Sequence, residues 1–179
     1  MCDFRTLRAE EIDVRVQQVA GSSRGIFAML LLYKDARVDM AMLDEKFGVF
    51  GWQREHSFKD GRNYCKVSIY NPDTREWVAK EDVGTESNTE AEKGQASDAF
   101  KRACVNIGIG RELYTSPKIV VQLNEGEYKE DGTDKFGNKK YKINSWVKFR
   151  VAVINYSEVR SINKITITDQ NHNIRFSLQ

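Results

Sequence analysis

An apolar stripe along residues 96–107 is the feature that most constrains the fold of this chain. Six small or apolar residues recur at i, i+3, i+4, i+7, i+8 and i+11, namely Ala96, Ala99, Phe100, Ala103, Cys104 and Ile107. In an α-helix this spacing gathers them on one side. Thr89 and Glu92 have the spacing of a capping box, so we expect the helix to begin at Glu90 and to end at Gly108 and Gly110. Such a helix needs a sheet face to cover it.

Three strand-length segments before the helix predict that sheet. They run from Trp52 to Phe58, from Tyr64 to Tyr70 and from Glu76 to Val83. The dipeptides Asp60-Gly61 and Pro72-Asp73 between them are typical of tight turns, so an antiparallel meander is expected.

The middle segment has two different faces. One set of alternate side chains is apolar and consists of Cys65, Val67 and Ile69. The other set is basic and aromatic and consists of Tyr64, Lys66, Ser68 and Tyr70. Because successive side chains of a strand point to opposite faces, one set faces the core and the other faces solvent or a ligand.

The N-terminal third predicts two helices around a strand. Residues 6–20 are interpreted as a helix, with Thr6 as N-cap, acidic residues in the first turn and Gly21 as terminator. Residues 25–33 form an apolar strand, and "GSSRG" before it is interpreted as a turn rather than a phosphate cradle. A short helix follows and ends at Gly48, with three apolar residues on one face, Met40, Leu43 and Phe47.

The C-terminal third predicts further strands. "KIVVQL" leads into a charged loop at 125–142, interpreted as a solvated hairpin. A strand with inward Val147, Phe149, Val151 and Val153 and a closing hairpin at "DQNHN" complete the chain. The expected fold class is α+β, with a β-β-β-α core on an antiparallel sheet. We expect one domain over 1–179, made of an N-terminal helix and strand at 1–35, the core at 36–118 and C-terminal strands at 119–179.

Composition and missing motifs exclude several classes of protein. No apolar run reaches the length of a membrane span, the N-terminus is charged, and the three cysteines are odd in number and widely spaced, which indicates a reduced cytoplasmic protein. No phosphate-binding P-loop is present, and His56 and His172 lack ligand-spaced partners, so neither a nucleotide cofactor nor a metal is expected. With a net charge of only +2, any polyanion must be held by a local patch.

Two local charge clusters carry alternative interpretations. Glu81 and Asp82 would hold magnesium in a nuclease, but neighbouring strand residues point to opposite faces, which favours a solvated strand end. Lys101 and Arg102 lie on the polar side of the predicted helix, where Asp98 is placed for an ordinary i,i+4 ion pair with Arg102. The cation and aromatic residues around Lys66 are typical of a surface that binds single-stranded nucleic acid. The alternative for that face is a solvated surface, or one that a neighbouring subunit buries.

The segments "FGVFGW", "NYCKVSI", "EDVGTES" and "EKGQASDAFKRACVNIGIGRELY" resemble the Rad52/22 family of double-strand-break repair proteins. The chain is most similar to the short bacteriophage and prophage members, the single-strand annealing proteins. The match runs from about Arg37 to Tyr114 and more loosely through the first predicted helix.

The resemblance implies an oligomeric ring or helical filament that anneals single-stranded DNA without ATP, and therefore no catalytic residues. It implies that Lys101 and Arg102 line the DNA groove and that Arg37 contacts DNA. The next basic position of the family is Val105 here. The expected partners are single-stranded DNA, the annealed duplex, further copies of the chain, and a single-strand-binding protein or phage exonuclease. The chain ends without the long tail of eukaryotic members, so annealing is expected rather than mediator activity.

Our leading hypothesis is an ATP-independent annealing protein of homologous recombination, phage- or prophage-encoded and cytoplasmic in a bacterial host. The DNA-binding candidates combine the residues above with further cations and aromatics, and are Lys101, Arg102, Arg37, Lys66, Arg54, Lys93, Tyr64 and Tyr70. The alternatives are a metal-dependent nuclease using Glu81 or Asp82, and a non-catalytic recombinase-loading or assembly protein whose basic face binds acidic residues of a partner.

Overall fold

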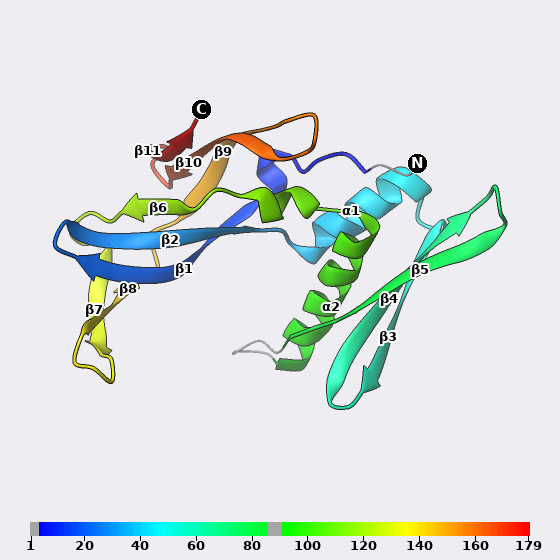
Figure 1. Ribbon diagram of the computed structural model, residues 1–179, viewed down its shortest axis with the longest axis horizontal. Coiled ribbons are helices and arrows are strands. Elements are labelled where there is room, and N and C mark those ends of the chain that lie inside the picture. The colour runs from blue at the N-terminus through cyan, green and yellow to red at the C-terminus, as the bar shows by residue number, and fades with distance from the viewer. Residues whose placement is uncertain (1–3, 86–90) are drawn as a thin grey trace. The chain divides into compact units, whose positions relative to one another are not determined.

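The computed structural model describes residues 4–85 and 91–179, with the side chains of helix α2 described from residue 94 onward. The capping box of Thr89 and Glu92, the expected helix start at Glu90 and the side chain of Lys93 lie outside the described residues. The chain divides into two compact units, each built from segments that alternate along the sequence. Unit 1 holds residues 1–6 and 35–111, and unit 2 holds residues 7–34 and 112–179 (Figure 1).

Unit 1 is a three-stranded antiparallel sheet with helices packed on it. Its elements in chain order are α1 (Ala36–Phe47), β3 (Trp52–Lys59), β4 (Arg62–Asn71), β5 (Glu76–Val83) and α2 (Ala91–Ile107). The strand order is β3-β4-β5, as the turn dipeptides predicted. Asp60 and Gly61 both have positive φ, 51° and 74°, the left-handed pair that a two-residue hairpin turn requires.

The stripe of α2 forms the core of unit 1. Ala99, Phe100, Ala103 and Cys104 are buried against β4, whose Cys65 and Val67 are also fully buried. Gly84 allows the end of β5 to approach this helix, because a Cβ there would lie 1.9 Å from the Gln95 carbonyl oxygen. Burial raises the pKa of the Cys65 thiol to about 11, so this cysteine is a core residue rather than a nucleophile.

Helix α1 begins and ends where the sequence indicates. The Asp35 side chain accepts a hydrogen bond from the Arg37 amide at 2.8 Å and caps the N-terminus, while Gly48 ends the helix at φ 71°. The buried face of α1 differs in part from the expected one. Leu43 is buried as expected, but the second buried apolar residue is Met42, and Met40 is only half-buried.

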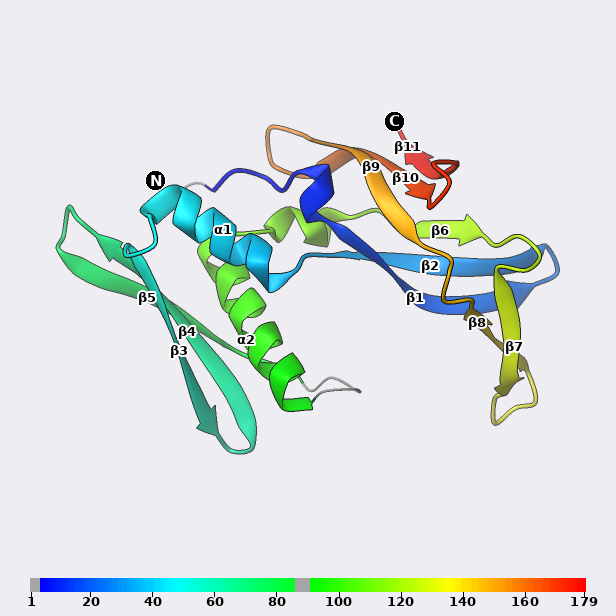
Figure 2. The same ribbon diagram turned by 180° about the vertical axis from the view of Figure 1, so that it is seen from behind.

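Unit 2 is built on a six-stranded antiparallel sheet of order β11-β10-β9-β1-β2-β6 (Figure 2). Its elements are η1 (Ala9–Glu11), β1 (Asp13–Ser22), β2 (Gly25–Tyr33), η2 (Arg111–Thr115), β6 (Ile119–Gln122), β9 (Phe149–Tyr156), β10 (Ile162–Asp169) and β11 (Ile174–Leu178). The first residue of η2, Arg111, closes unit 1. The expected α+β class with antiparallel sheets is confirmed. Neither described helix combines the length and the apolar character needed to cross a membrane.

The predicted helix over residues 6–20 is wrong. Only Ala9–Glu11 form a short 3-10 turn, and Asp13–Ser22 are a strand that pairs with β2 along its whole length. Gly21 continues the strand, and the turn lies at Ser23–Arg24. The prediction rests on capping signals at Thr6 and Gly21, which the strand pairing overrides. A β-bulge at Gln17 inserts one residue between Val16 and Gln18 and shifts the alternation of the strand.

A second bulge, in β9, makes the inward and outward alternation of that strand differ from the predicted one. Val147, Phe149 and Val151 are buried as predicted, but Val153 is 41% exposed. The register with β10 shifts between Thr166, opposite Val153, and Ile167, opposite Val151. The extra residue in β9 moves the following side chains to the other face.

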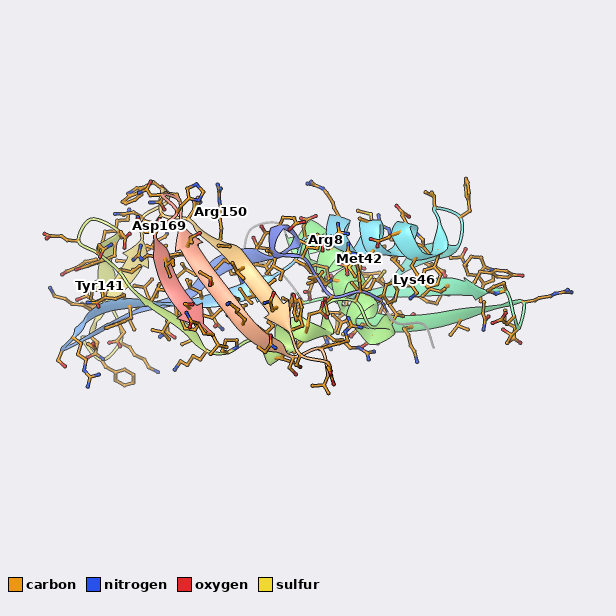
Figure 3. The ribbon with its side chains drawn as sticks, turned by 90° about the horizontal axis from the view of Figure 1, so that it is seen from above. Arg8, Met42, Lys46, Tyr141, Arg150 and Asp169 are labelled. Atoms are coloured by element: carbon orange, nitrogen blue, oxygen red, sulfur yellow. The ribbon has the colours of Figure 1, made fainter. Side chains whose placement is uncertain are left out.

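The charged loop at 125–142 is a two-stranded hairpin of β7 (Tyr128–Thr133) and β8 (Lys139–Ile143). The rings of Tyr128 and Tyr141 meet edge to face with centroids 5.8 Å apart, and Tyr141 (labelled in Figure 3) lies against Gly21 of β1. The hairpin therefore has one anchored end and a solvated, charged remainder.

A buried charge network ties the edge of the unit 2 sheet together. The guanidinium of Arg175 on β11 donates two hydrogen bonds of 2.8 Å to the carboxylate of Glu127 and one of 2.6 Å to the Gln122 carbonyl. Asp169 of β10 (labelled in Figure 3) lies 3.5 Å from the same guanidinium. The hydrogen bonds from Arg175 hold the pKa of Glu127 below its usual value, although burial opposes this.

Candidate nucleic-acid interface

The polar side of α2 carries the cation pair Lys101 and Arg102. Lys101 is half-buried, and the side chain of Arg102 is 44% exposed. Arg102 donates a hydrogen bond to Asp82 of β5 at 3.2 Å, and Asn106 donates to the same carboxylate at 3.1 Å. Asp98 instead accepts bonds from the Thr85 amide and hydroxyl, both at 2.9 Å. The described contacts thus tie Arg102 to β5 rather than to Asp98 within the helix.

Arg54 of β3 lies on the side of the sheet that α2 covers, since it pairs with the core residue Val67. Its guanidinium carbon lies 4.9 Å from the ring centre of Phe100, and Trp52 stacks on the same ring with centroids 6.1 Å apart. Cation–π contact fixes the arginine while leaving its N–H groups open, because Arg54 remains exposed. Phe100 immediately precedes Lys101, so the fold brings Arg54 to the same turn of α2 as the cation pair.

The opposite face of the sheet carries the other predicted residues. Residues paired across an antiparallel ladder point to the same face, so Tyr64, Lys66 and Tyr70 lie away from the face that α2 covers. Lys66 forms an ion pair with Glu55 at 2.6 Å, which raises the pKa of the lysine and lowers that of the glutamate. The Lys59 ammonium lies 5.7 Å from the ring centre of Tyr64, and the ring centres of Tyr70 and Trp77 are 5.4 Å apart.

The structure therefore divides the predicted DNA-binding residues into two surfaces. The helix-side surface holds Lys101, Arg102 and Arg54, and the outer sheet face holds Tyr64, Lys66 and Tyr70. Arg37 lies apart from both, in the first turn of α1, with its side chain 89% exposed and 3.8 Å from the Asp35 carboxylate.

The acidic pair considered for a metal site is split by the strand. Asp82 turns toward α2 and accepts hydrogen bonds from the Arg102 guanidinium and the Asn106 side-chain amide, while Glu81 is paired in register with Lys66 on the outer face. Within residues 4–85 and 91–179, no group of three or more acidic, histidine or cysteine side chains is placed to hold a metal ion. The strand thus places Glu81 and Asp82 on opposite faces of the sheet.

Comparison with known families decides the relationship. A family model described as the Rad52/22 family double-strand break repair protein matches residues 5–132. The chain belongs to the Rad52/22 family. No curated protein matches the sequence. The matched segment of this Rad52/22 protein contains all of unit 1 from Arg5 onward and the β1–β2 hairpin.

Membership of the Rad52/22 family supports a role in DNA repair and recombination, with DNA binding and self-assembly in general terms. The sequence analysis missed three residues that shape the surface of this Rad52/22 protein, namely Trp52, Phe100 as the platform for Arg54, and Asp82 as the partner of Arg102. The ladder pairing of Arg54 with Val67, a core residue, is the signal that would have placed Arg54 on the helix side.

Proposed function

We propose that this protein binds single-stranded DNA on the helix-side surface of unit 1 and anneals complementary strands without ATP, as an oligomer. The observation that carries the proposal is Arg54 seated on Phe100, directly before Lys101 and Arg102. Arg54 reaches this turn of α2 from β3, while Arg102 is tied to Asp82 of β5, so cations flank the turn from two chain segments. Membership of a repair family makes DNA the polyanion that such a cluster serves.

Annealing sets physical requirements that this surface meets. Two strands pair only if their bases stay accessible, so the protein must hold the phosphates and leave the base edges free. Arginine and lysine side chains on a helix and a neighbouring strand supply phosphate contacts of that kind. Strand pairing breaks no covalent bond, so the proposed activity needs neither a nucleophile nor a nucleotide.

The low net charge of +2 fits this proposal through assembly. A single copy offers few cations, but an oligomer repeats the same patch along a bound strand. Binding of one copy then raises the effective concentration of DNA at the next patch. Weak phosphate contacts in each copy add up to tight binding of a long strand.

The testing experiment compares the wild-type protein with Lys101→Ala/Arg102→Ala in fluorescence-monitored annealing of two complementary oligonucleotides, without ATP, across a salt titration. We expect the wild type to accelerate annealing and the acceleration to fade with salt. Losing two phosphate contacts from each copy should reduce the salt slope of single-strand binding by roughly 1.4 per copy.

The matched control is Lys148→Ala/Lys164→Ala, which removes the same charge from exposed positions in unit 2. If both double variants lose the same affinity, overall charge rather than the helix-side surface holds the DNA, and the proposed site is refuted. If the wild-type protein binds single strands but does not accelerate pairing, the loading or assembly function replaces annealing.

A further inference from the structure

One end of the unit 1 sheet exposes a cluster of large apolar side chains. Phe50 is 96% exposed and Val49 68% exposed in the loop between α1 and β3. The Tyr70 amide donates to the Gly51 carbonyl at 3.1 Å, which joins this loop to the end of β4. At the start of β5, Val78 is 52% exposed on the face that α2 covers, and Trp77 is 45% exposed on the outer face. Clusters of this kind mark surfaces that another protein covers.

A groove of about 640 Å³ lies at the same end, between α1, α2 and the turn joining β4 to β5. Its apolar lining is supplied by Phe47, Ile69, Val78 and Ile107. Two lysines contribute to it, Lys80 and Lys46, and Asp73 is its one acidic residue, so its net charge is positive. The Lys46 ammonium (labelled in Figure 3) also lies 5.1 Å from the Phe4 ring centre. An occupant that matches this lining has an apolar side chain beside a carboxylate.

Unit 2 presents that chemistry on a tight turn. Val159, between β9 and β10, is 81% exposed, and the exposed Glu158 precedes it. The turn is held by two backbone hydrogen bonds, from the Ser157 amide to the Ser161 carbonyl at 2.8 Å and from the Arg160 amide to the Ser157 carbonyl at 2.9 Å. Its conformation is therefore fixed before any partner binds, which lowers the entropy lost on docking.

We propose that the groove at the α1–α2 end of unit 1 receives the Glu158–Val159 turn of a second copy of this chain. The inference rests on the proposed function, because annealing is assigned there to an oligomer. A groove and a turn on different parts of the chain make a head-to-tail contact. Such contacts repeat from copy to copy and generate rings or filaments rather than closed two-fold dimers.

The proposed contact between two copies brings opposite charges together. Val159 enters the apolar lining, while Glu158 meets Lys80, which has no ion pair within the part of the chain that the structure describes. Opposite charges across an interface set the register of docking more than its strength, so reversing one of them should misalign the two copies. This predicts that single charge reversals break assembly and that paired reversals restore it.

The experiment measures particle mass by size-exclusion chromatography with light scattering for the full chain and its variants. Lys80→Glu and Glu158→Lys, each alone, should shift the protein from its assembled mass toward single copies. Mixing the two variants should restore assembly, because each groove then meets a turn of opposite charge. Restoration on mixing shows that the contact joins different copies rather than two parts of one chain. Lys164→Glu is the charge-matched control and should assemble normally.

Three outcomes overturn the inference. A wild-type protein that is a single copy at micromolar concentration refutes the contact, as do single variants that assemble normally. Loss of assembly that neither mixing nor the combined Lys80→Glu/Glu158→Lys variant repairs means that another segment or another protein occupies the groove. Single-strand binding, measured in parallel by fluorescence anisotropy, separates this failure from failure of the proposed function, since the helix-side cations are untouched.

Discussion

The two units of this protein use charged residues in opposite ways. In unit 2, Arg175 and Glu127 are 9% and 7% exposed and satisfy each other with two hydrogen bonds of 2.8 Å. In unit 1, the one contact that the described part of the chain gives the Arg54 guanidinium is with the ring of Phe100, and Arg54 is exposed. A charged side chain whose hydrogen bonds are made within a unit contributes to its fold. A charged side chain that is held in place but keeps free donors is available to a ligand.

The largest expected effect comes from breaking the buried network. Arg175→Ala leaves the carboxylates of Glu127 and Asp169 close together without their cation, which should destabilise the protein by about 3–5 kcal/mol. Thermal denaturation followed by circular dichroism measures the loss. The exposed ion pair of Lys139 and Glu130 supplies the control, since Lys139→Ala should cost no more than about 1 kcal/mol. Equal losses would mean that burial does not distinguish the two pairs.

The same network predicts how stability depends on pH. The folded pKa of Glu127 is lowered, chiefly by its hydrogen bonds with Arg175, so its stabilising contribution is complete above the unfolded pKa. That contribution is lost as the pH falls through the lowered folded pKa. The difference in unfolding free energy between wild type and Glu127→Gln should therefore be largest near pH 7 and shrink below about pH 4. Urea denaturation across this range tests it, and a constant difference would contradict the assignment.

In unit 1 the platform under Arg54 can be tested separately from its charge. Arg54→Lys keeps the charge but loses the planar stacking on Phe100, so single-strand affinity should fall by a few-fold. Arg54→Ala should fall further, by about tenfold, since a charged hydrogen bond is also lost. Fluorescence anisotropy with an oligothymidine probe measures both. Equal affinities for Arg54→Lys and wild type would show that stacking does not position the cation.

The smallest expected effect is a gain. The Asp82 carboxylate accepts from Nε of Arg102 at 3.2 Å, so it offsets the charge of this arginine and competes with a phosphate for it. Asp82→Asn keeps the shape but removes the competing charge, and single-strand affinity should rise by up to about fivefold, the range of a partly exposed ion pair. Glu81→Gln on the outer face is the matched control with the same charge change. A loss of affinity in Asp82→Asn would indicate that Asp82 orients Arg102 instead of competing for it.

Local patterns predicted much of unit 1. Asp60-Gly61 required a two-residue turn with positive φ, and the stripe from Ala96 to Ile107 required a buried helix face. Both signals act over a few residues, so no distant contact was needed to interpret them. The motif from "EDVGTES" to "GRELY" likewise indicated the family that the comparison established.

Long-range contacts decided the rest. Residues 6–20 carry helix-capping signals but contain a strand with a bulge at Gln17, and only its pairing with β2 reveals this. The partner of Arg102 is Asp82 from another element, although Asp98 is nearer in sequence. Ladder register placed Arg54 and Lys66 on opposite faces of one sheet. Short-range signals in the sequence specified the local elements and singled out the cations that we propose bind DNA. Tertiary structure decided which side chains share a surface, because that depends on register between distant segments.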